Sequence, residues 1–318
     1  MRSMFRAGVI AALVGPVGVM AGQGSRPEII RTRHGVPHIY AESLWGGGYG
    51  LGWVQLEDHG PRVVHGLIAA RGHLGRVFGR DSIEGDFSRR AVHAIARTKW
   101  IGLKVATRDV YLGFAAAVND YLRAHPDEFL PGIEPNFVGW DVLARDMAPP
   151  AIGAARRLVA RETGRLARPV RSGLDVDGPD DGSNAWALAP TRTKSGHAIL
   201  LRNPHLDWGA GYYEGHLVIP GVIDFYGDFR VGGPFGVIGG FNRDLGWATT
   251  NNAVDNEEVY RVEVAPGTVN QILLDGRPVR LTRQRTTVEF RDGNGWATET
   301  REAWSSPIGP VVDRVGGA

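Results

Sequence analysis

The sequence has 318 residues, of which 43% are hydrophobic and 22% are charged, with 45 glycines, 19 prolines and no cysteine. At about 100–200 residues per domain, this length allows one large domain or two small ones, and the composition excludes collagen-like and disordered chains. The lack of cysteine excludes disulfide frameworks, thiolate zinc sites, iron–sulfur clusters and cysteine nucleophiles, so a covalent catalyst must use oxygen or nitrogen.

The charge balance argues against a nucleic-acid partner. The 36 Lys and Arg residues are nearly balanced by 34 Asp and Glu, and removal of Arg2 and Arg6 would leave 34 of each. Phosphate binding requires a clustered basic patch, whereas the arginines here are scattered along the chain. We therefore expect no nucleic-acid binding.

Residues 1–22 have the layout of a secretory signal peptide. Two arginines are followed by an uncharged stretch over residues 7–19 and then by small residues. The alternative is a membrane anchor, but Gly15, Pro16 and Gly18 interrupt an apolar run that is already short for a span of about 20 residues. The pattern predicts export to the periplasm or the medium, with no membrane span in the mature protein.

Residues 23–164 are expected to form a mainly helical part. The text from Glu28 to Tyr40 alternates apolar and polar residues around a bend, which predicts two short strands. Helical spacing of apolar residues predicts helices over Trp53–Phe78, Asp109–His125 and Met147–Ala167. The glycines between these regions do not fit G-x-G-x-x-G, so no nucleotide site is expected.

Residues 165–182 are rich in Pro, Gly and Asp and indicate an exposed linker, or spacer, between two parts of the chain. Residues 183–318 then become β-rich. Short apolar segments separated by turns predict strands at residues 186–190, 198–202, 216–220, 222–226, 245–250, 262–266 and 286–290.

Several hydrolytic mechanisms lack their motifs in this sequence. Neither G-x-S-x-G nor S-x-x-K surrounds any serine, which excludes the α/β-hydrolase and penicillin-binding arrangements. H-E-x-x-H is also missing, and Gly35 and Pro37 prevent His34 and His38 from sharing one helical face. We expect these two histidines to bond backbone groups at a turn. A metal hydrolase that uses histidines stays open as an alternative, with chelator-sensitive activity as its test.

Ser183 follows the acidic, glycine-containing linker and begins a buried-looking strand. One interpretation is an ordinary turn serine. The other is that the Gly182–Ser183 bond is cut, so that Ser183 becomes an N-terminus. Its α-amino group, with a pKa of about 7.7–8.0, would then supply the base while its hydroxyl supplies the nucleophile.

Three segments resemble the penicillin amidase family of N-terminal-nucleophile hydrolases. Residues 28–62 with 71–79 resemble the opening of its small subunit, residues 181–206 its processing site, and residues 233–260 the lining of its pocket. The resemblance implies an α+β fold, the αββα sandwich of these hydrolases in incomplete form, with a mainly helical small-subunit part. It also implies a self-processing acylase that hydrolyses the N-acyl bond of a small amide substrate, with both subunits cut from one precursor.

The resemblance implies three catalytic residues. The family's serine falls on Ser183, and its Gln or His twenty-two residues later falls on His205, which would hold the amino group through hydrogen bonds. The family's backbone oxyanion donor falls on Asn251. Removing such a donor commonly costs about 2.7–4 kcal/mol of transition-state stabilisation.

No cofactor is needed for this chemistry, although some family members bind a structural calcium. The resemblance places its oxygen ligands at Asp255, Glu257 and Glu258, with Glu162 as a further candidate. A solvated acidic edge is the alternative.

The family's second oxyanion donor, an Asn side chain, would lie beyond Ala318, so the chain as written looks truncated in its large subunit. We expect it to be a poor or inactive catalyst in this form. A non-catalytic secreted protein that binds an acylated ligand is the alternative. The acyl specificity stays open. Trp186, Phe235 and Trp208 are candidates for the lining of a pocket, although aromatic residues on strands more often belong to the core.

Overall fold

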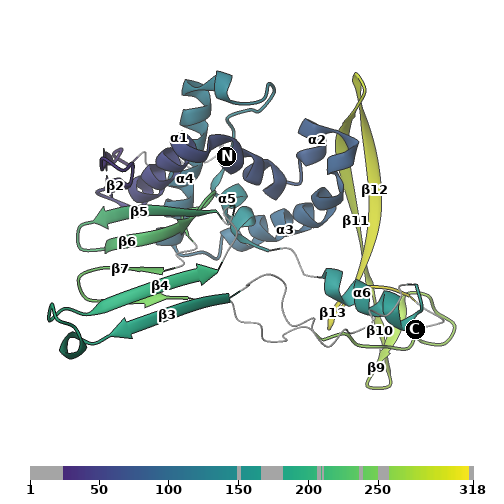
Figure 1. The fold of residues 1–318 in the computed structure, drawn as a ribbon. Helices are drawn as coiled ribbons and strands as arrows, with labels where there is room; N and C mark the ends of the chain where they lie inside the picture. Colours follow the sequence, from purple (N-terminus) through teal and green to yellow (C-terminus); the bar gives the residue numbers. More distant parts are fainter. Residues whose placement is uncertain are drawn as a thin grey trace, which may run out of the picture.

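The computed structural model describes residues 24–148, 152–165, 182–205, 209, 211–235, 239–249 and 258–314. Helices dominate the earlier part of the chain and strands the later part, so the expected α+β class is confirmed (Figure 1). The α-helices are α1 Leu44–Ala70, α2 Leu74–Phe78, α3 Glu84–Trp100, α4 Val105–Ala124, α5 Gly139–Asp146 and α6 Ile152–Glu162, with 3-10 turns at Arg80–Ser82, Pro126–Glu128 and Pro190–Arg192.

The described strands form one larger sheet and several hairpins. They are β1 Glu28–Arg31, β2 Pro37–Tyr40, β3 Gly182–Leu188, β4 Ile199–His205, β5 Tyr212–Ile219, β6 Ile223–Arg230, β7 Gly239–Phe241, β8 Gly246–Ala248, β9 Gln271–Leu274, β10 Arg277–Arg280, β11 Thr282–Asp292, β12 Gly295–Ser306 and β13 Gly309–Pro310.

The first helix is longer than its sequence pattern suggests. The predicted helix over 53–78 begins already at Leu44, where the Ser43 hydroxyl accepts a hydrogen bond from the Gly46 amide at 3.1 Å. It ends at Ala70, and α2 follows after Gly72, which has a φ of +66°. The helix also bends at His59, two residues before Pro61, because proline cannot continue the hydrogen-bond ladder.

The other predicted helices agree in part. The helix expected over 109–125 is α4, whereas α6 is shorter than the stretch expected over 147–167. Two helices, α3 and α5, were not predicted. Only three of the 17 residues of α3 are buried, and the four buried residues of the short α5 include a glycine and an aspartate, so both helices leave a weak apolar pattern to detect.

The six-stranded sheet has the order β1-β2-β5-β6-β7-β8. Its strands are antiparallel except for β2 and β5, which run parallel with His38 opposite His216. The β1–β2 hairpin confirms the bend expected between residues 28 and 40. This sheet therefore joins strands from both sides of residues 165–182.

One face of the sheet packs against α1, and α4 packs on α1 in turn, to form the main core. Alternate residues of β5 and β6 point toward these helices, as the period-two burial of both strands shows. Leu217, Phe225 and Phe229 join Val54 of α1 and Phe114 of α4 in this cluster.

The opposite face of the sheet carries polar side chains, and it corrects one expectation from the sequence. His38 Nδ1 lies 2.9 Å from His216 Nδ1, and His216 Nε2 lies 2.8 Å from Asp224 Oδ1. His34 Nε2 accepts a hydrogen bond from Arg33 Nε. The rings of His34 and His38 thus contact other side chains rather than the backbone of a turn.

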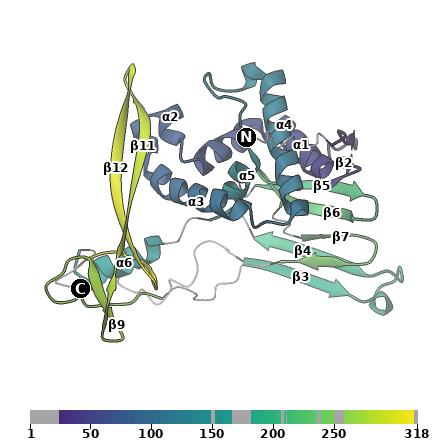
Figure 2. The same ribbon diagram turned by 180° about the vertical axis from the view of Figure 1, so that it is seen from behind.

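The remaining strands form hairpins outside this sheet. The β3–β4 ribbon lies beside β8, and the long β11–β12 hairpin packs its Val288 and Phe290 against Ile83, next to α2 and α3 (Figure 2). The strand expected over 262–266 is absent from the described structure. There, Val264 makes only an isolated bridge to Ile272, at the edge of the β9–β10 hairpin.

Candidate functional site

Ser183 lies at the start of the β3–β4 ribbon. In this antiparallel pair Gly182 is opposite His205, and Ser183 is opposite Pro204. Proline has no N–H to donate, so the ladder is weakened where Ser183 lies. The serine is half-buried and is the second residue of β3.

The ring of His205 is held by two amide side chains. Its Nε2 atom lies 3.0 Å from Asn184 Nδ2 and 3.2 Å from Asn203 Nδ2. Both amide nitrogens are donors, so Nε2 accepts a hydrogen bond from each of them. The two asparagines fix the orientation of the His205 ring.

The side chains of Ser183 and His205 lie on opposite faces of the ribbon. Successive residues of a strand alternate in direction, and His205 shares its face with Asn184, opposite to that of Ser183. The backbone of Ser183 is related to His205 more directly than its side chain is, because Ser183 is bonded to Gly182, and Gly182 is paired with His205. His205 is therefore nearer to the backbone nitrogen of residue 183 than to its hydroxyl.

Arg202 connects the Ser183 face of the ribbon to the main sheet. It is opposite Ala185, so it points to the same side as Ser183, and it forms an ion pair with Asp228 of β6. The Arg202 side chain also packs against Gly239 of β7, where an added Cβ would lie 2.6 Å from Arg202 Nη1. Within the described residues, Nη1 is buried without a hydrogen-bond partner. Arg202 was not among the residues singled out from the sequence, where its only signal is a charge that ends the apolar run of residues 198–201.

The other residues singled out from the sequence are only partly described. Asn251, Asp255, Glu257 and Trp208 lie outside the described residues. Glu162 ends α6, and Glu258 begins the segment that leads to β9.

The described residues do not by themselves form a metal site. Across residues 24–314, leaving out the undescribed gaps, no group of three or more His, Asp or Glu side chains lies close enough to hold an ion. Calcium binding through Glu162, Glu258 and their two undescribed partners stays a prediction. In the same part of the chain, no helix combines the length and the apolar character that crossing a membrane requires.

The candidate pocket aromatics differ in their surroundings. Trp186 is 52% exposed and lies on the His205 face of the ribbon. Phe235 packs edge-on against Tyr111 of α4, with ring centres 5.0 Å apart, so it bridges the two parts of the chain.

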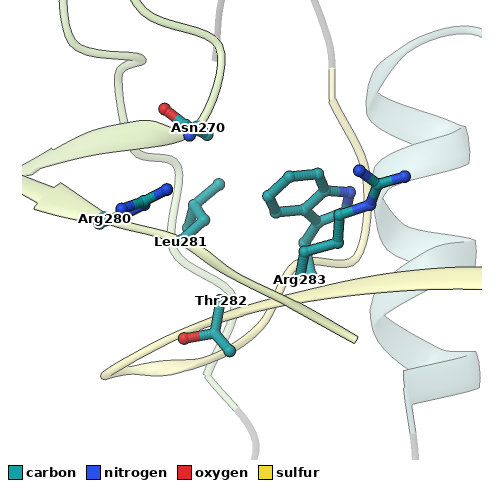
Figure 3. A pocket seen from close by; sticks show the side chains of 6 residues that line it. Asn270, Arg280, Leu281, Thr282 and Arg283 are labelled. Carbon is teal, nitrogen blue, oxygen red and sulfur yellow. The ribbon is translucent and has the colours of Figure 1, made fainter. Parts of the chain in front are cut away.

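Two cavities lie away from Ser183. The larger, of about 430 Å³, is shown in Figure 3, between the β9–β10 hairpin and the start of β11. Its described lining is Asn270, Arg280, Leu281, Thr282, Arg283 and Trp304. The smaller, of about 300 Å³, lies between the β1–β2 turn, α1 and β5. None of the described residues that line either cavity belongs to the β3–β4 ribbon.

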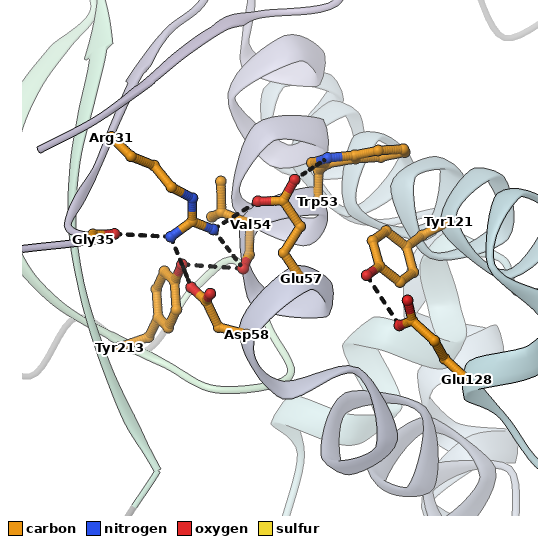
Figure 4. A network of polar contacts seen from close by, with 9 residues as sticks. All are labelled: Arg31, Gly35, Trp53, Val54, Glu57, Asp58, Tyr121, Glu128 and Tyr213. Atoms are coloured by element: carbon orange, nitrogen blue, oxygen red, sulfur yellow. Dashed lines mark hydrogen bonds and ion pairs between the residues drawn. The ribbon is translucent and has the colours of Figure 1, made fainter. Parts of the chain in front are cut away.

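The smaller cavity borders a polar network around Arg31 (Figure 4). Arg31 donates to Glu57 at 2.6 Å and to Asp58 at 2.9 Å, and Tyr213 donates to Asp58 at 2.5 Å. Burial opposes the charge of Arg31, but the hydrogen bonds to Glu57 and Asp58 raise its pKa above the ordinary value. Burial, together with the hydrogen bond to Asp58, raises the pKa of Tyr213, which remains a donor. This network fastens the β1–β2 turn to the bend of α1.

Known proteins resemble this chain over most of its length. The sequence model of the family described as penicillin amidase matches residues 27–318. The chain is 28% identical over 321 residues to the acyl-homoserine lactone acylase PvdQ of Pseudomonas fluorescens (strain Pf0-1), covering 90% of this chain and 41% of that protein. It is 27% identical over 329 residues to the aculeacin-A acylase of Actinoplanes utahensis, covering 89% of this chain and 41% of that protein.

Among solved structures, a thermostable penicillin G acylase from Alcaligenes faecalis is 22% identical, with a TM-score of 0.34. The overlap covers 43% of this chain and 83% of that chain. The present chain spans about two fifths of the length of these two curated relatives.

Proposed function

Because this chain belongs to the penicillin amidase family, we propose that it acts as a self-processing acylase in which cleavage of the Gly182–Ser183 bond makes Ser183 the catalytic residue. The family has the fold of N-terminal-nucleophile hydrolases, and the described α+β structure is part of that fold. The observation that carries the proposal is the position of Ser183. This residue is in the second residue pair of the β3–β4 ribbon and comes directly after the linker of residues 165–182.

Self-cleavage uses the Ser183 hydroxyl against its own peptide bond. The Oγ atom attacks the Gly182 carbonyl carbon, the C–N bond breaks, and the nitrogen takes up a proton to become the α-amino group. Gly182 has no side chain to block this approach. Water then hydrolyses the resulting ester, which leaves Ser183 with a free amine and a free hydroxyl.

The same two groups then hydrolyse an N-acyl amide. The α-amino group takes the proton of Oγ as Oγ attacks the amide carbonyl carbon, and it returns that proton to the leaving amine. The backbone N–H of Asn251 donates to the tetrahedral oxyanion. Water attacks the acyl ester by the same route and releases the acid.

His205 has the role of holding the amine. It lies across from Gly182, so the amine freed at residue 183 emerges beside it. Asn184 and Asn203 hold its ring in place through Nε2. An amine near its pKa of about 7.7–8.0 is partly unprotonated at neutral pH, as a general base must be.

We place this activity outside the cytoplasm. The proposal rests on residues 1–22, whose arginines, apolar stretch and small residues suit removal on export. The expected mature protein contains a small chain from about residue 23 and a large chain from Ser183. Cell fractionation followed by N-terminal sequencing of both chains tests this placement.

Mass spectrometry of the purified full-length parent protein, rather than of the chain as written, tests the catalytic proposal. We expect two chains, the larger of which begins at Ser183, and turnover of at least one of an aryl-acetyl amide, a glutaryl amide and a long-chain acyl-homoserine lactone. Ser183→Ala should abolish cleavage and reduce turnover by at least about a thousandfold. Ser183→Cys should retain cleavage, since it exchanges only the nucleophilic atom.

Ser195→Ala is the matched control, because it removes a hydroxyl from the exposed turn between β3 and β4. It should cleave and turn over substrate as the wild type does. An uncut chain that hydrolyses these amides would refute the mechanism, and an uncut, inactive chain would favour a ligand-binding protein.

A further inference from the structure

The loop over residues 231–235, between β6 and β7, is held by a buried glutamine of α1. The amide of Gly232 donates to Gln55 Oε1 at 2.7 Å, and Gln55 Nε2 donates to the Gly233 carbonyl at 3.2 Å. Gln55 has no exposed surface. The oxygen and the nitrogen of its side-chain amide therefore both bond to the backbone of this loop. Replacing Gln55 with an apolar residue would leave two buried backbone groups, the Gly232 N–H and the Gly233 carbonyl, without these bonds.

The end of α5 holds the same loop from another side. The Arg145 guanidinium donates to the Val231 carbonyl and packs against Gly232, whose φ of +95° suits glycine. Asp146 lies against Gly233 so closely that an added Cβ would be 2.5 Å from its Oδ1. The two glycines thus allow the loop to lie directly on Arg145 and Asp146.

Tyr111 of α4 completes this arrangement. Its hydroxyl donates to Asp146 Oδ2 at 3.1 Å, and its ring packs edge-on against Phe235 at the end of the loop. Four residues after Phe235 the chain reaches Gly239, which lies against Arg202 of the ribbon that carries Ser183. The loop therefore connects the helical part of the chain to the surroundings of the proposed nucleophile.

We propose that Gln55, Tyr111, Arg145 and Asp146 are positioning residues that fix the 231–235 loop for substrate binding. This inference rests on the proposed function, since it assigns the loop to the acyl site of the same acylase. All four side chains come from before residue 182, whereas the loop comes after it. Substrate affinity then depends on contacts across the proposed cleavage point, although none of the four residues takes part in the bond-breaking steps.

The decisive variant is Gln55→Met, which keeps the size of the side chain and removes both hydrogen bonds. The chain offers a matched control in Asn119. Its side-chain amide also bonds to two backbone groups, here the carbonyl and the N–H of Phe137. Asn119 Nδ2 donates to the Phe137 carbonyl at 2.7 Å, and Phe137 N donates to Asn119 Oδ1 at 2.8 Å. Phe137 lies before the start of α5, at the helix end opposite to Arg145 and Asp146, and among the described residues none of its hydrogen bonds reaches the 231–235 loop. Asn119→Leu therefore reports the cost of losing such a pair elsewhere.

Two measurements on the full-length protein separate positioning from stability. In Gln55→Met, KM for a substrate that the wild type hydrolyses should rise by about tenfold or more, with kcat changed less than about threefold. Hydrogen exchange at the Gly232 amide should also accelerate by about tenfold or more. Asn119→Leu should lower thermal stability to a similar extent and leave both readouts unchanged. Gln55→Glu, which keeps the acceptor for Gly232, should retain part of the protection at that amide.

An active wild type whose KM is unaffected by Gln55→Met, or affected equally by Asn119→Leu, would overturn the inference and leave the proposed function standing. Unchanged exchange at Gly232 would also overturn it, because the loop would then not depend on Gln55. A wild type that hydrolyses no N-acyl amide would remove the proposed function itself, and the substrate role of the loop with it.

Discussion

Gly48 of α1 lies directly against the backbone carbonyl of Val110 in α4, where an added Cβ would come within 2.1 Å of the oxygen. One turn away, a Cβ at Gly113 would lie 1.9 Å from the carbonyl oxygen of Trp45. Glycines on both helices therefore allow their backbones to approach at this crossing. Because the oxygen atoms belong to the backbone, they cannot move aside as a flexible side chain would.

We predict that Gly48→Ala destabilises the protein by about 1–3 kcal/mol, since overpacking must push α1 and α4 apart. Urea unfolding measures this cost. Gly85→Ala is the control, because no atom lies within 4 Å of the Cβ position in α3. There alanine should raise stability by about 0.5–1 kcal/mol through its better helix propensity. Equal losses in the two variants would contradict the packing argument.

Asp141 is a second stabilising centre. Its carboxylate is 1% exposed and accepts hydrogen bonds from Arg71 at 2.5 Å and His93 at 2.7 Å. Burial opposes ionisation, but the hydrogen bonds from His93 and Arg71 hold the pKa of Asp141 below its ordinary value. This stabilisation is therefore present at neutral pH and is lost as the pH falls through the lowered pKa.

We expect Asp141→Asn to cost about 3 kcal/mol at pH 7, because it leaves a mostly buried arginine without its counter-charge. The difference from the wild type should begin to narrow below about pH 4, where the carboxyl of the unfolded chain takes up its proton, and should disappear once the pH falls below the lowered pKa of the folded state. Unfolding free energies measured from pH 3 to pH 7 test both points. Asp244→Asn, at an exposed position beside Arg243, should behave as the wild type throughout.

Asp146 should show the opposite pH dependence. Burial raises its pKa from 3.8 to about 6, against the charges of Arg145 and Arg230 and the hydrogen bond from Tyr111. The folded state thus favours the protonated form, and the resulting stabilisation is full below pH 4 and is lost as the pH rises through 6.

Asp146→Asn cannot ionise, so its stability relative to the wild type should improve by about 2–3 kcal/mol between pH 4 and pH 7. Denaturant titrations of both proteins at several pH values would reveal this change. Parallel pH profiles for the two proteins would show that Asp146 does not titrate in this range.

The ion pair between Arg202 and Asp228 predicts an effect on self-cleavage. It ties β4, opposite the start of β3, to β6 of the main sheet. Arg202→Met should slow the appearance of the chain that begins at Ser183 by at least about tenfold, because small displacements of a reacting group are costly. Adding Asp228→Asn removes the unpaired carboxylate and should recover stability without recovering the rate.

Arg243→Met removes an arginine whose side chain is 90% exposed and serves as the control for lost charge. Its cleavage should match that of the wild type when both are followed by mass spectrometry. Cleavage of Arg202→Met at the wild-type rate would show that the ion pair does not orient Ser183.

The elements that could be predicted from the sequence are those in which apolar residues recur at one regular spacing. The alternation over 28–40 and the helical spacing over 109–125 correspond to the β1–β2 hairpin and to α4. The start of α1 could not be predicted in this way, because a run of glycines is a poor helix former on its own. It is helical here because α4 packs against Gly48, and that is a tertiary contact which local propensity does not contain.

The same distinction between local pattern and tertiary contact applies to the candidate site. Ser183 was found from the change in composition before it, and the resemblance to a family supplied His205. No local pattern could indicate that Gln55 and Asp146 meet the 231–235 loop, because these residues are distant in the sequence and each resembles an ordinary helix residue. The opposite faces of Ser183 and His205 likewise follow from the pairing register, which only the structure supplies.

The parallel pairing of β2 with β5 places strands from both sides of residue 182 in one hydrogen-bonded sheet. If the chain is cut before Ser183, neither product retains a complete sheet, and the two must stay associated to remain folded. Assembly of the precursor is a first-order process, whereas recovery of the separated, denatured products requires an encounter between two molecules and depends on their concentration. The intact linker would then serve as a tether during biosynthesis, and the two-chain product would be difficult to renature.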